Sequence, residues 1–157
     1  MTPIECKQGF TIATATATLP LVSRIVDELV SLAQEISDTQ ERLAFTVSDR
    51  ENQTDIYSKE LRSVESEMAK KSIRLAECTD ELLELNTLTE SVTDGFVDFP
   101  AIRNEEEICL CWRRGESEVM HWHFVDEPCR QRRLVDLQLV QRSVERQLAS
   151  AASVLKP

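Results

Sequence analysis

The sequence predicts a mainly α-helical α+β protein, in which a long antiparallel helical hairpin carries a small antiparallel β-sheet and a C-terminal helix. Three observations lead to this fold class. Between Pro20 and Gly95 the chain has no glycine or proline, and helix-favouring residues dominate. From residue 95 apolar and polar residues alternate with period two, as in a half-buried strand. Helical spacing of apolar residues then returns near the C-terminus.

The helical scaffold is expected over residues 10–92 as two antiparallel helices. In its first half, apolar residues recur every seven positions at Val22, Leu29, Ile36 and Leu43. In its second half, a seam steps by four and three from Tyr57 to Leu85 and is interrupted only by Lys71. A polar residue in such a seam commonly sets register or oligomeric state. The two phases predict a turn near residues 47–55, although one continuous rod would also fit.

The N-terminal run Thr11–Thr18 has two interpretations. It alternates threonine with isoleucine or alanine, which locally indicates a strand. A threonine cap followed by a short helix that ends at Pro20 is the competing interpretation.

The small β module is expected over residues 95–126, with about three strands. Alternation predicts one strand over 108–113 and another over 119–125, joined by a turn at Gly115. Phe96–Phe99 stands directly before Pro100 and suggests a further short strand, where the proline lies at an edge or ends the ladder.

The last predicted element is a C-terminal amphipathic helix over residues 130–155. Its apolar positions repeat at three and four from Leu137 to Leu155. This helix could fold onto the hairpin or join a partner chain. We expect the whole chain, residues 1–157, to form a single domain.

Composition and charge restrict the partners. The formal net charge is −10, with 18 lysines and arginines against 28 acidic residues, so nucleic acid is not an expected partner. The five cysteines are an odd number and fit free thiols in a reducing compartment. No run approaches the roughly 18 apolar residues of a membrane span. We therefore expect a soluble cytoplasmic protein without a membrane partner.

A series of motifs follows the predicted elements in order: Phe10-Thr11-Ile12, Leu19-Pro20, Gly95-Phe96-Val97-Asp98-Phe99-Pro100-Ala101, Leu110-Cys111-Trp112, Gly115-Glu116 and Trp122-His123. In order and spacing these motifs resemble the bacterial family catalogued as domain of unknown function 2203. The resemblance covers about Phe10 to Arg132. It implies that Thr11–Leu19 begins a helix, and it implies no activity. Cys109, His121 and the segment Glu127–Arg132 depart from the family pattern.

Residues 95–129 gather both histidines, both tryptophans and three of the five cysteines. One hypothesis is zinc binding. The candidate ligands, suited to tetrahedral zinc, are Cys109, Cys111, His121 and His123. A strand register that pairs Cys109 with His121 puts all four on one face, whereas one that pairs Arg113 with Glu118 separates thiols from imidazoles. The alternative is that these are buried thiols and a structural histidine, with no cofactor.

A second hypothesis is a small-ligand or catalytic pocket. Its residues would be Asp98, Cys111, Trp112, Glu116 and His123. A carboxylate can orient an imidazole, and a thiol beside an imidazole can be activated. No nucleophile elbow, phosphate loop or oxyanion-hole motif accompanies these residues. The sequence therefore favours a protein that is not an enzyme.

The third hypothesis, which we prefer, is a structural or protein-interaction protein. It would self-associate through its helices as a homodimer or other homo-oligomer, and the sheet would be an end cap or a surface for an unidentified protein partner. Trp112 and Trp122 fit either a binding hot spot or the core. With Asp98, Cys111, Glu116 and His123, they complete the candidate binding residues.

Overall fold

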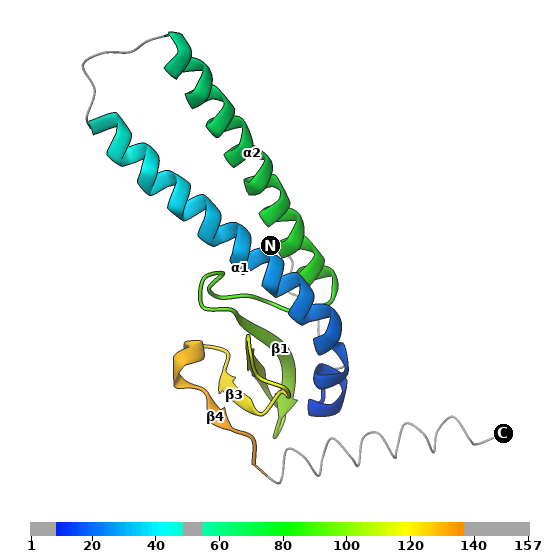
Figure 1. The fold of residues 1–157 in the computed structure, drawn as a ribbon. Coiled ribbons are helices and arrows are strands. Elements are labelled where there is room, and N and C mark those ends of the chain that lie inside the picture. Colours follow the sequence, from blue (N-terminus) through cyan, green and yellow to red (C-terminus); the bar gives the residue numbers. More distant parts are fainter. Residues whose placement is uncertain (1–8, 49–54, 137–157) are drawn as a thin grey trace, which may run out of the picture.

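The computed structural model describes residues 9–48 and 55–136, which form two long helices and one sheet (Figure 1). The helices are α1 (Ile12–Ser48) and α2 (Asp55–Glu84). The strands are β1 (Phe96–Arg103), β2 (Glu106–Arg113), β3 (His121–Phe124) and β4 (Arg133–Leu134). A short 3₁₀ helix, η1 (Cys129–Gln131), precedes the last strand. The predicted α+β class is confirmed.

Helix α1 begins at a reciprocal threonine cap. The Thr14 backbone N–H donates to the Thr11 hydroxyl at 3.1 Å, and the Thr11 N–H donates to the Thr14 hydroxyl at 2.8 Å. Two amides near the helix start are thereby satisfied. The helix implied by the family resemblance is confirmed, and the strand interpretation of residues 11–18 is wrong. Capping and the burial of Ala15 and Leu19 outweigh the β-branched composition.

Helix α1 continues through Pro20 to Ser48, so the short helix ending at that proline is also wrong. A proline inside a helix costs about 3 kcal/mol, because it removes a backbone hydrogen bond and crowds the preceding turn. Val22, Val26 and Leu29 follow the proline and are almost fully buried. Each such side chain contributes roughly 1.5–3 kcal/mol of apolar burial. Core packing therefore outweighs the proline penalty.

Helix α2 runs back along α1, which confirms the hairpin and excludes the single rod (Figure 1). Helix α1 ends at residue 48 and α2 begins at residue 55, in agreement with the predicted turn near residues 47–55. The Lys71 ammonium lies 2.9 Å from the Glu35 carboxylate of α1, so the polar break in the seam has a partner across the hairpin. Arg74 makes a bidentate contact with Glu28, at 2.6 and 2.9 Å.

The sheet is antiparallel, with strand order β1-β2-β3-β4. Strand β1 is an edge and continues through Pro100, so of the two roles expected for the proline the edge position is observed, and the proline does not end the ladder. On its outer side, Asp98 exchanges two backbone hydrogen bonds with Leu88. The backbone groups of Pro100, two residues further along, point to the same outer side as those of Asp98. The missing N–H of the proline therefore removes no hydrogen bond to β2. The Pro100 carbonyl accepts from the Phe10 N–H at 2.8 Å. Strand β4 was not predicted, because its two residues are too few to show alternation.

The β2–β3 register pairs Cys109 with His123 and Cys111 with His121. In the register considered for zinc binding, Cys109 would pair with His121, two residues away from the observed partner. A shift of two residues leaves each side chain on the same face of the sheet. Thiols and imidazoles therefore share one face. The strand predicted over 119–125 begins only at His121. Val119 lies outside the ladder because its side chain is fully buried and its backbone N–H donates to the Thr16 hydroxyl of α1 at 3.3 Å.

The two faces of the sheet have different chemistry. One face packs against the helices and forms the main core. Its strand residues are Val97, Phe99, Ala101, Ile108, Leu110, Trp112 and Trp122. The helices contribute the residues that lie near the sheet, from Ala15 to Leu29 on α1 and Cys78 and Leu82 on α2. The opposite face carries the cysteines and histidines of β2 and β3, partly covered by η1.

The predicted C-terminal helix over 130–155 falls largely outside the described residues. Its described beginning is not α-helical, because residues 129–131 form η1 and Arg133 and Leu134 pair with β3. Within the described residues, no helix has the length and apolar character needed to cross a membrane.

Candidate metal centre

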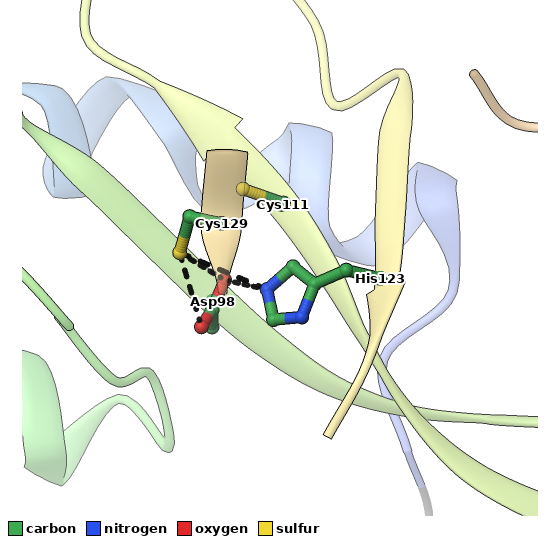
Figure 2. A group of neighbouring side chains, drawn as sticks. All are labelled: Asp98, Cys111, His123 and Cys129. Carbon is green, nitrogen blue, oxygen red and sulfur yellow. Dashed lines mark hydrogen bonds and ion pairs between the residues drawn. The ribbon is translucent and has the colours of Figure 1, made fainter. Parts of the chain in front are cut away.

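Four buried side chains meet on the sheet face that is turned away from the helices (Figure 2). Asp98 comes from β1, Cys111 from β2, His123 from β3 and Cys129 from η1. Their potential ligand atoms all lie within 4.8 Å of one another. None of the four residues is more than 7% exposed. Four different elements thus place one metal-type donor each in a small, closed space.

The register explains how three of these donors meet. Asp98 lies directly opposite Cys111, so their side chains stand side by side on one face. His123 lies opposite Cys109, one pair further along. Its ring reaches diagonally across β2, and its Nε2 comes within 2.8 Å of Asp98 Oδ1. Cys129 approaches from η1, with its Sγ 3.6 Å from each oxygen of the Asp98 carboxylate.

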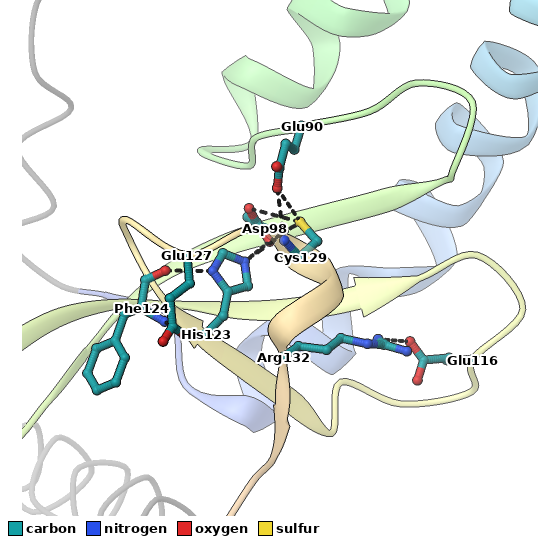
Figure 3. Close-up of polar contacts among 8 residues, drawn as sticks. All are labelled: Glu90, Asp98, Glu116, His123, Phe124, Glu127, Cys129 and Arg132. Carbon is teal, nitrogen blue, oxygen red and sulfur yellow. Dashed lines mark hydrogen bonds and ion pairs between the residues drawn. The ribbon is translucent and has the colours of Figure 1, made fainter.

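The orientation of the His123 ring is set by a backbone carbonyl. The Nδ1 atom lies 2.7 Å from the Phe124 carbonyl oxygen, which can only accept, so Nδ1 carries the proton (Figure 3). In the neutral ring, the Nε2 lone pair then points at Asp98 and Cys129. Histidines that bind metals almost always donate their second ring N–H to such a group. The ring is therefore held in the tautomer that a metal ligand requires.

The separations between donors resemble those of a tetrahedral zinc site. Zinc bond lengths of about 2.3 Å to sulfur and 2.0–2.2 Å to nitrogen or oxygen imply sulfur–nitrogen and sulfur–oxygen separations of about 3.6 Å. Cys129 Sγ lies 3.7 Å from His123 Nε2 and 3.6 Å from Asp98. The nitrogen–oxygen separation would be about 3.4 Å, against 2.8 Å between His123 and Asp98. Among these three pairs, only His123 and Asp98 would need to move noticeably apart.

Without a metal, the cluster is held by hydrogen bonds and one charge pair. Hydrogen bonding of the imidazolium to Asp98, and next to the Cys111 sulfur, raises the pKa of His123 to about 10, against the opposing effect of burial. The imidazolium and the Asp98 carboxylate then neutralise each other. Burial raises the pKa of the Cys129 thiol, and its hydrogen bond to Glu90 raises it further. In the metal-free site, Cys129 is therefore a neutral thiol.

Glu90 adds a second carboxylate beside the cluster (Figure 3). It lies in the segment between α2 and β1, and its Oε2 accepts from the Cys129 N–H at 3.1 Å and from the Cys129 thiol at 2.8 Å. These hydrogen bonds lower the pKa of Glu90. Glu90 therefore orients Cys129 from outside the group of four.

The cluster is poorly suited to nucleophilic catalysis. In a catalytic Cys–His–Asp arrangement, the thiol and the carboxylate contact different ring nitrogens. Here Cys129 and Asp98 both face Nε2 of His123, at 3.7 and 2.8 Å. A reactive cysteine also needs a lowered thiol pKa and access to solvent, whereas Cys129 is buried and its pKa is raised.

The structure brings together some of the predicted site residues and separates others. Asp98, Cys111 and His123 of the predicted pocket meet. From the zinc hypothesis, Cys111 and His123 belong to the cluster, but Cys109 and His121 do not. Burial and the charge of Asp98 raise the pKa of Cys109 to about 12. The Nδ1 of His121 lies 3.3 Å from a Glu116 carboxylate oxygen without a well-aligned hydrogen bond.

The remaining candidate residues have structural contacts. Trp112 and Trp122 lie in the main core, on the face opposite the cluster. The indole N–H of Trp112 donates to the Glu116 carbonyl oxygen at 2.8 Å. The Glu116 carboxylate accepts from the Arg113 N–H at 2.6 Å and from the Arg132 guanidinium at 2.5 Å. Glu116 thereby connects the turn after β2 to the segment after η1.

Sequence reasoning did not predict Glu90 or Cys129 as site residues. Glu90 lies in a polar segment where no pattern distinguishes it from its neighbours. Cys129 follows the last predicted strand, so strand parity gave no orientation for it. The one available signal was the concentration of reactive side chains, because Cys129 is the last residue of the segment that holds both histidines and three cysteines.

The fold and site together define an α+β protein with a helical hairpin and a four-stranded sheet that carries a buried Asp–Cys–His–Cys cluster. The chain belongs to the family DUF2203, described as uncharacterized conserved proteins, whose profile matches residues 8–135. That range includes both helices and all four strands. No curated protein and no solved structure gives a significant match to the chain.

Proposed function

We propose that the protein binds one divalent transition metal ion, best fitted by zinc, through Asp98, Cys111, His123 and Cys129. The observation that carries this proposal is the convergence of four buried donors around a histidine whose tautomer a backbone carbonyl selects. Two thiolates, one imidazole and one carboxylate are a donor set that suits zinc, and soft sulfur ligands disfavour magnesium and calcium.

The ion would be structural. Four protein ligands and complete burial leave no open coordination position, which is the usual distinction between structural and catalytic zinc. Each ligand belongs to a different element, so the ion would connect η1 to β1, β2 and β3. Such a connection is valuable for a small sheet, because a few short strands with one exposed face have little stability of their own.

The test is the metal content of tag-free protein expressed with added zinc. We expect about one zinc per chain, and we expect Cys129→Ser to lose most of it. Cys109→Ser is the matched control, since Cys109 is a buried thiol on the same sheet face but outside the cluster. Loss of zinc from Cys109→Ser alone would instead favour the set predicted from sequence.

Cobalt(II) substitution gives an independent readout of the ligands. Thiolate-to-cobalt charge transfer absorbs strongly in the near ultraviolet, and its intensity increases with the number of bound thiolates. We expect the native intensity in Cys109→Ser, and about half of it in Cys129→Ser once cobalt is added to saturation. A native protein that takes up neither zinc nor cobalt would contradict the proposal.

We also propose self-association through the part of the hairpin that lies far from the sheet. Near the sheet, seam residues such as Leu29 and Leu82 are fully buried. Further along the hairpin, the seam is only half-buried, at Leu32, Ile36, Leu43, Leu61, Val64 and Met68. A second copy, forming a homodimer, would cover these positions. The proposal includes an unidentified protein partner that binds the same surface. It also includes a cytoplasmic location. The four cysteines in the described residues are free thiols.

Sedimentation velocity over a range of concentrations tests the self-association. We expect a dimer that Leu61→Glu dissociates, because this change puts a charge into the seam. Arg62→Glu, at the exposed neighbouring position, is the control and should leave the dimer intact. A concentration-independent monomer would exclude this function.

A further inference from the structure

A pocket beside the cysteine and histidine cluster has an unusual lining. Its walls are Asp94, Phe96, Arg113, Arg130 and Arg132, and it encloses about 340 Å³. This volume is at the lower end of the range for small-molecule sites. We call it the arginine pocket. Neither the predicted site residues nor the metal cluster includes its three arginines.

Charge distinguishes the arginine pocket from the rest of the protein. The chain as a whole carries a net charge of −10. The pocket lining has three arginines against one aspartate, and Arg132 also pairs with Glu116 just outside the lining, which leaves a local excess of one positive charge. Concentrated positive charge on an acidic protein attracts a small anion without attracting nucleic acid in general. The pocket therefore favours anions over cations, and its volume restricts it to small ligands.

Two of the three arginines lie over the ring of Phe96, which is buried. The guanidinium carbons of Arg113 and Arg132 lie 5.2 and 5.3 Å from the ring centroid. Stacking on an aromatic face holds a planar guanidinium in place while leaving its N–H donors available. Two forks are thereby oriented at the pocket before any ligand binds, which reduces the entropy cost of binding.

The donors of the arginine pocket are only partly used by the protein. Within the described part of the chain, the Arg113 guanidinium pairs with no carboxylate. Arg130 is 80% exposed and lies 3.5 Å from Asp94, a loose contact. Arg132 pairs with Glu116 through one nitrogen, and its other donors stay available. Most of the guanidinium hydrogen-bonding capacity is therefore left for a ligand.

We infer that the arginine pocket binds the phosphate group of a small phosphate monoester. Such a group carries close to two negative charges at neutral pH and can be contacted by all three arginines of the lining. Its oxygens accept the paired N–H groups of guanidinium forks, as phosphate sites commonly require. The volume exceeds that of a bare phosphate and leaves room for part of the organic group.

The location of the arginine pocket connects it to the cluster without depending on a metal. Phe96 packs against Cys111 and Cys129, so the cluster lies behind the pocket wall. Arg113 follows Cys111 by two residues on the same strand, and Arg130 and Arg132 follow Cys129 by one and three residues. The register of β1 and β2 aligns Phe96 with Arg113, and the chain through η1 adds Arg130 and Arg132 to the lining.

The experiment is a calorimetric titration of the purified protein at low ionic strength and pH 7.5, with phenyl phosphate, inorganic phosphate and acetate. We expect saturable binding of phenyl phosphate, weaker binding of inorganic phosphate and none of acetate. Arg113→Gln should weaken phenyl phosphate binding about tenfold or more, because one charge-assisted contact is lost. Arg114→Gln is the matched control, since this neighbour pairs with Asp27 and does not line the pocket.

Each outcome is decisive. Binding of phenyl phosphate that Arg113→Gln weakens and Arg114→Gln does not would support the inference. Absence of saturable binding, or equal weakening by both variants, would overturn it. Inorganic phosphate that binds as tightly as phenyl phosphate would overturn the assignment to an ester. Because Cys109, Cys111 and Cys129 are unchanged in these variants, the result is independent of the metal-content test.

Discussion

Cys129→Ser should abolish most of the stabilisation that zinc gives to the folded protein. Cys129 is the only ligand of the proposed site that η1 supplies. Loss of an outer-shell partner typically lowers metal affinity 10–100-fold, so we expect at least about 100-fold for a direct ligand. At a free zinc concentration 1,000 times the native dissociation constant, stabilisation falls from about 4.1 to about 1.4 kcal/mol. The difference corresponds to roughly 10 °C in Tm for a domain of this size.

The assay is a thermal melt of each variant with and without zinc, in which every variant is compared with its own metal-free form. This comparison removes the direct effect of the substitution. That effect should be small for Cys129→Ser, because the serine hydroxyl can still donate to Glu90, which lies 2.8 Å from the native sulfur. Cys109→Ser should keep the native zinc shift. Equal zinc shifts in Cys109→Ser and Cys129→Ser would refute the assignment of the ligands.

Two further predictions concern the metal-free protein and the core. The pKa of His123 is raised to about 10 in the folded protein, so its contribution to stability is complete below about pH 6.5 and is lost as the pH rises towards 10. Urea unfolding of metal-free protein between pH 6 and 10 should show this decline, and Asp98→Asn should make it shallower; a slope unchanged by Asp98→Asn would contradict the pairing. Leu82→Ala should cost about 2–5 kcal/mol, because Leu82 is fully buried, and Leu83→Ala, at an exposed neighbour, less than about 0.5 kcal/mol. Similar costs for both leucines, measured by urea unfolding, would show that α2 packs on a different face.

The helical scaffold could be predicted because its information is local. A long region without glycine or proline and a seam of apolar residues at four and three define helices regardless of their neighbours. The same local reasoning could not settle Thr11–Thr18, because β-branched residues favour a strand unless a cap and a core face compete. The Thr11 and Thr14 cap and the burial of Ala15 decided for the helix.

The candidate site was predictable only in part. Asp98, Cys111 and His123 were identified together from their residue types, since a carboxylate can orient an imidazole and an imidazole can activate a thiol. Their distances depended on a register that no residue in the turn specifies, and a shift of one residue would have moved the imidazoles to the core face. Cys129 and Glu90 required knowledge of how η1 and the segment before β1 fold over the sheet.

By itself, the sequence determined the α+β class, the helical scaffold and the segment that holds the reactive side chains. These features follow from backbone propensity and periodicity, which act over a few residues. The tertiary structure decided the strand register, the passage of α1 through Pro20, the fourth strand and the meeting of Cys129 with Asp98, Cys111 and His123. These features depend on contacts between residues that are distant in the chain, where the burial of one group sets the position of another.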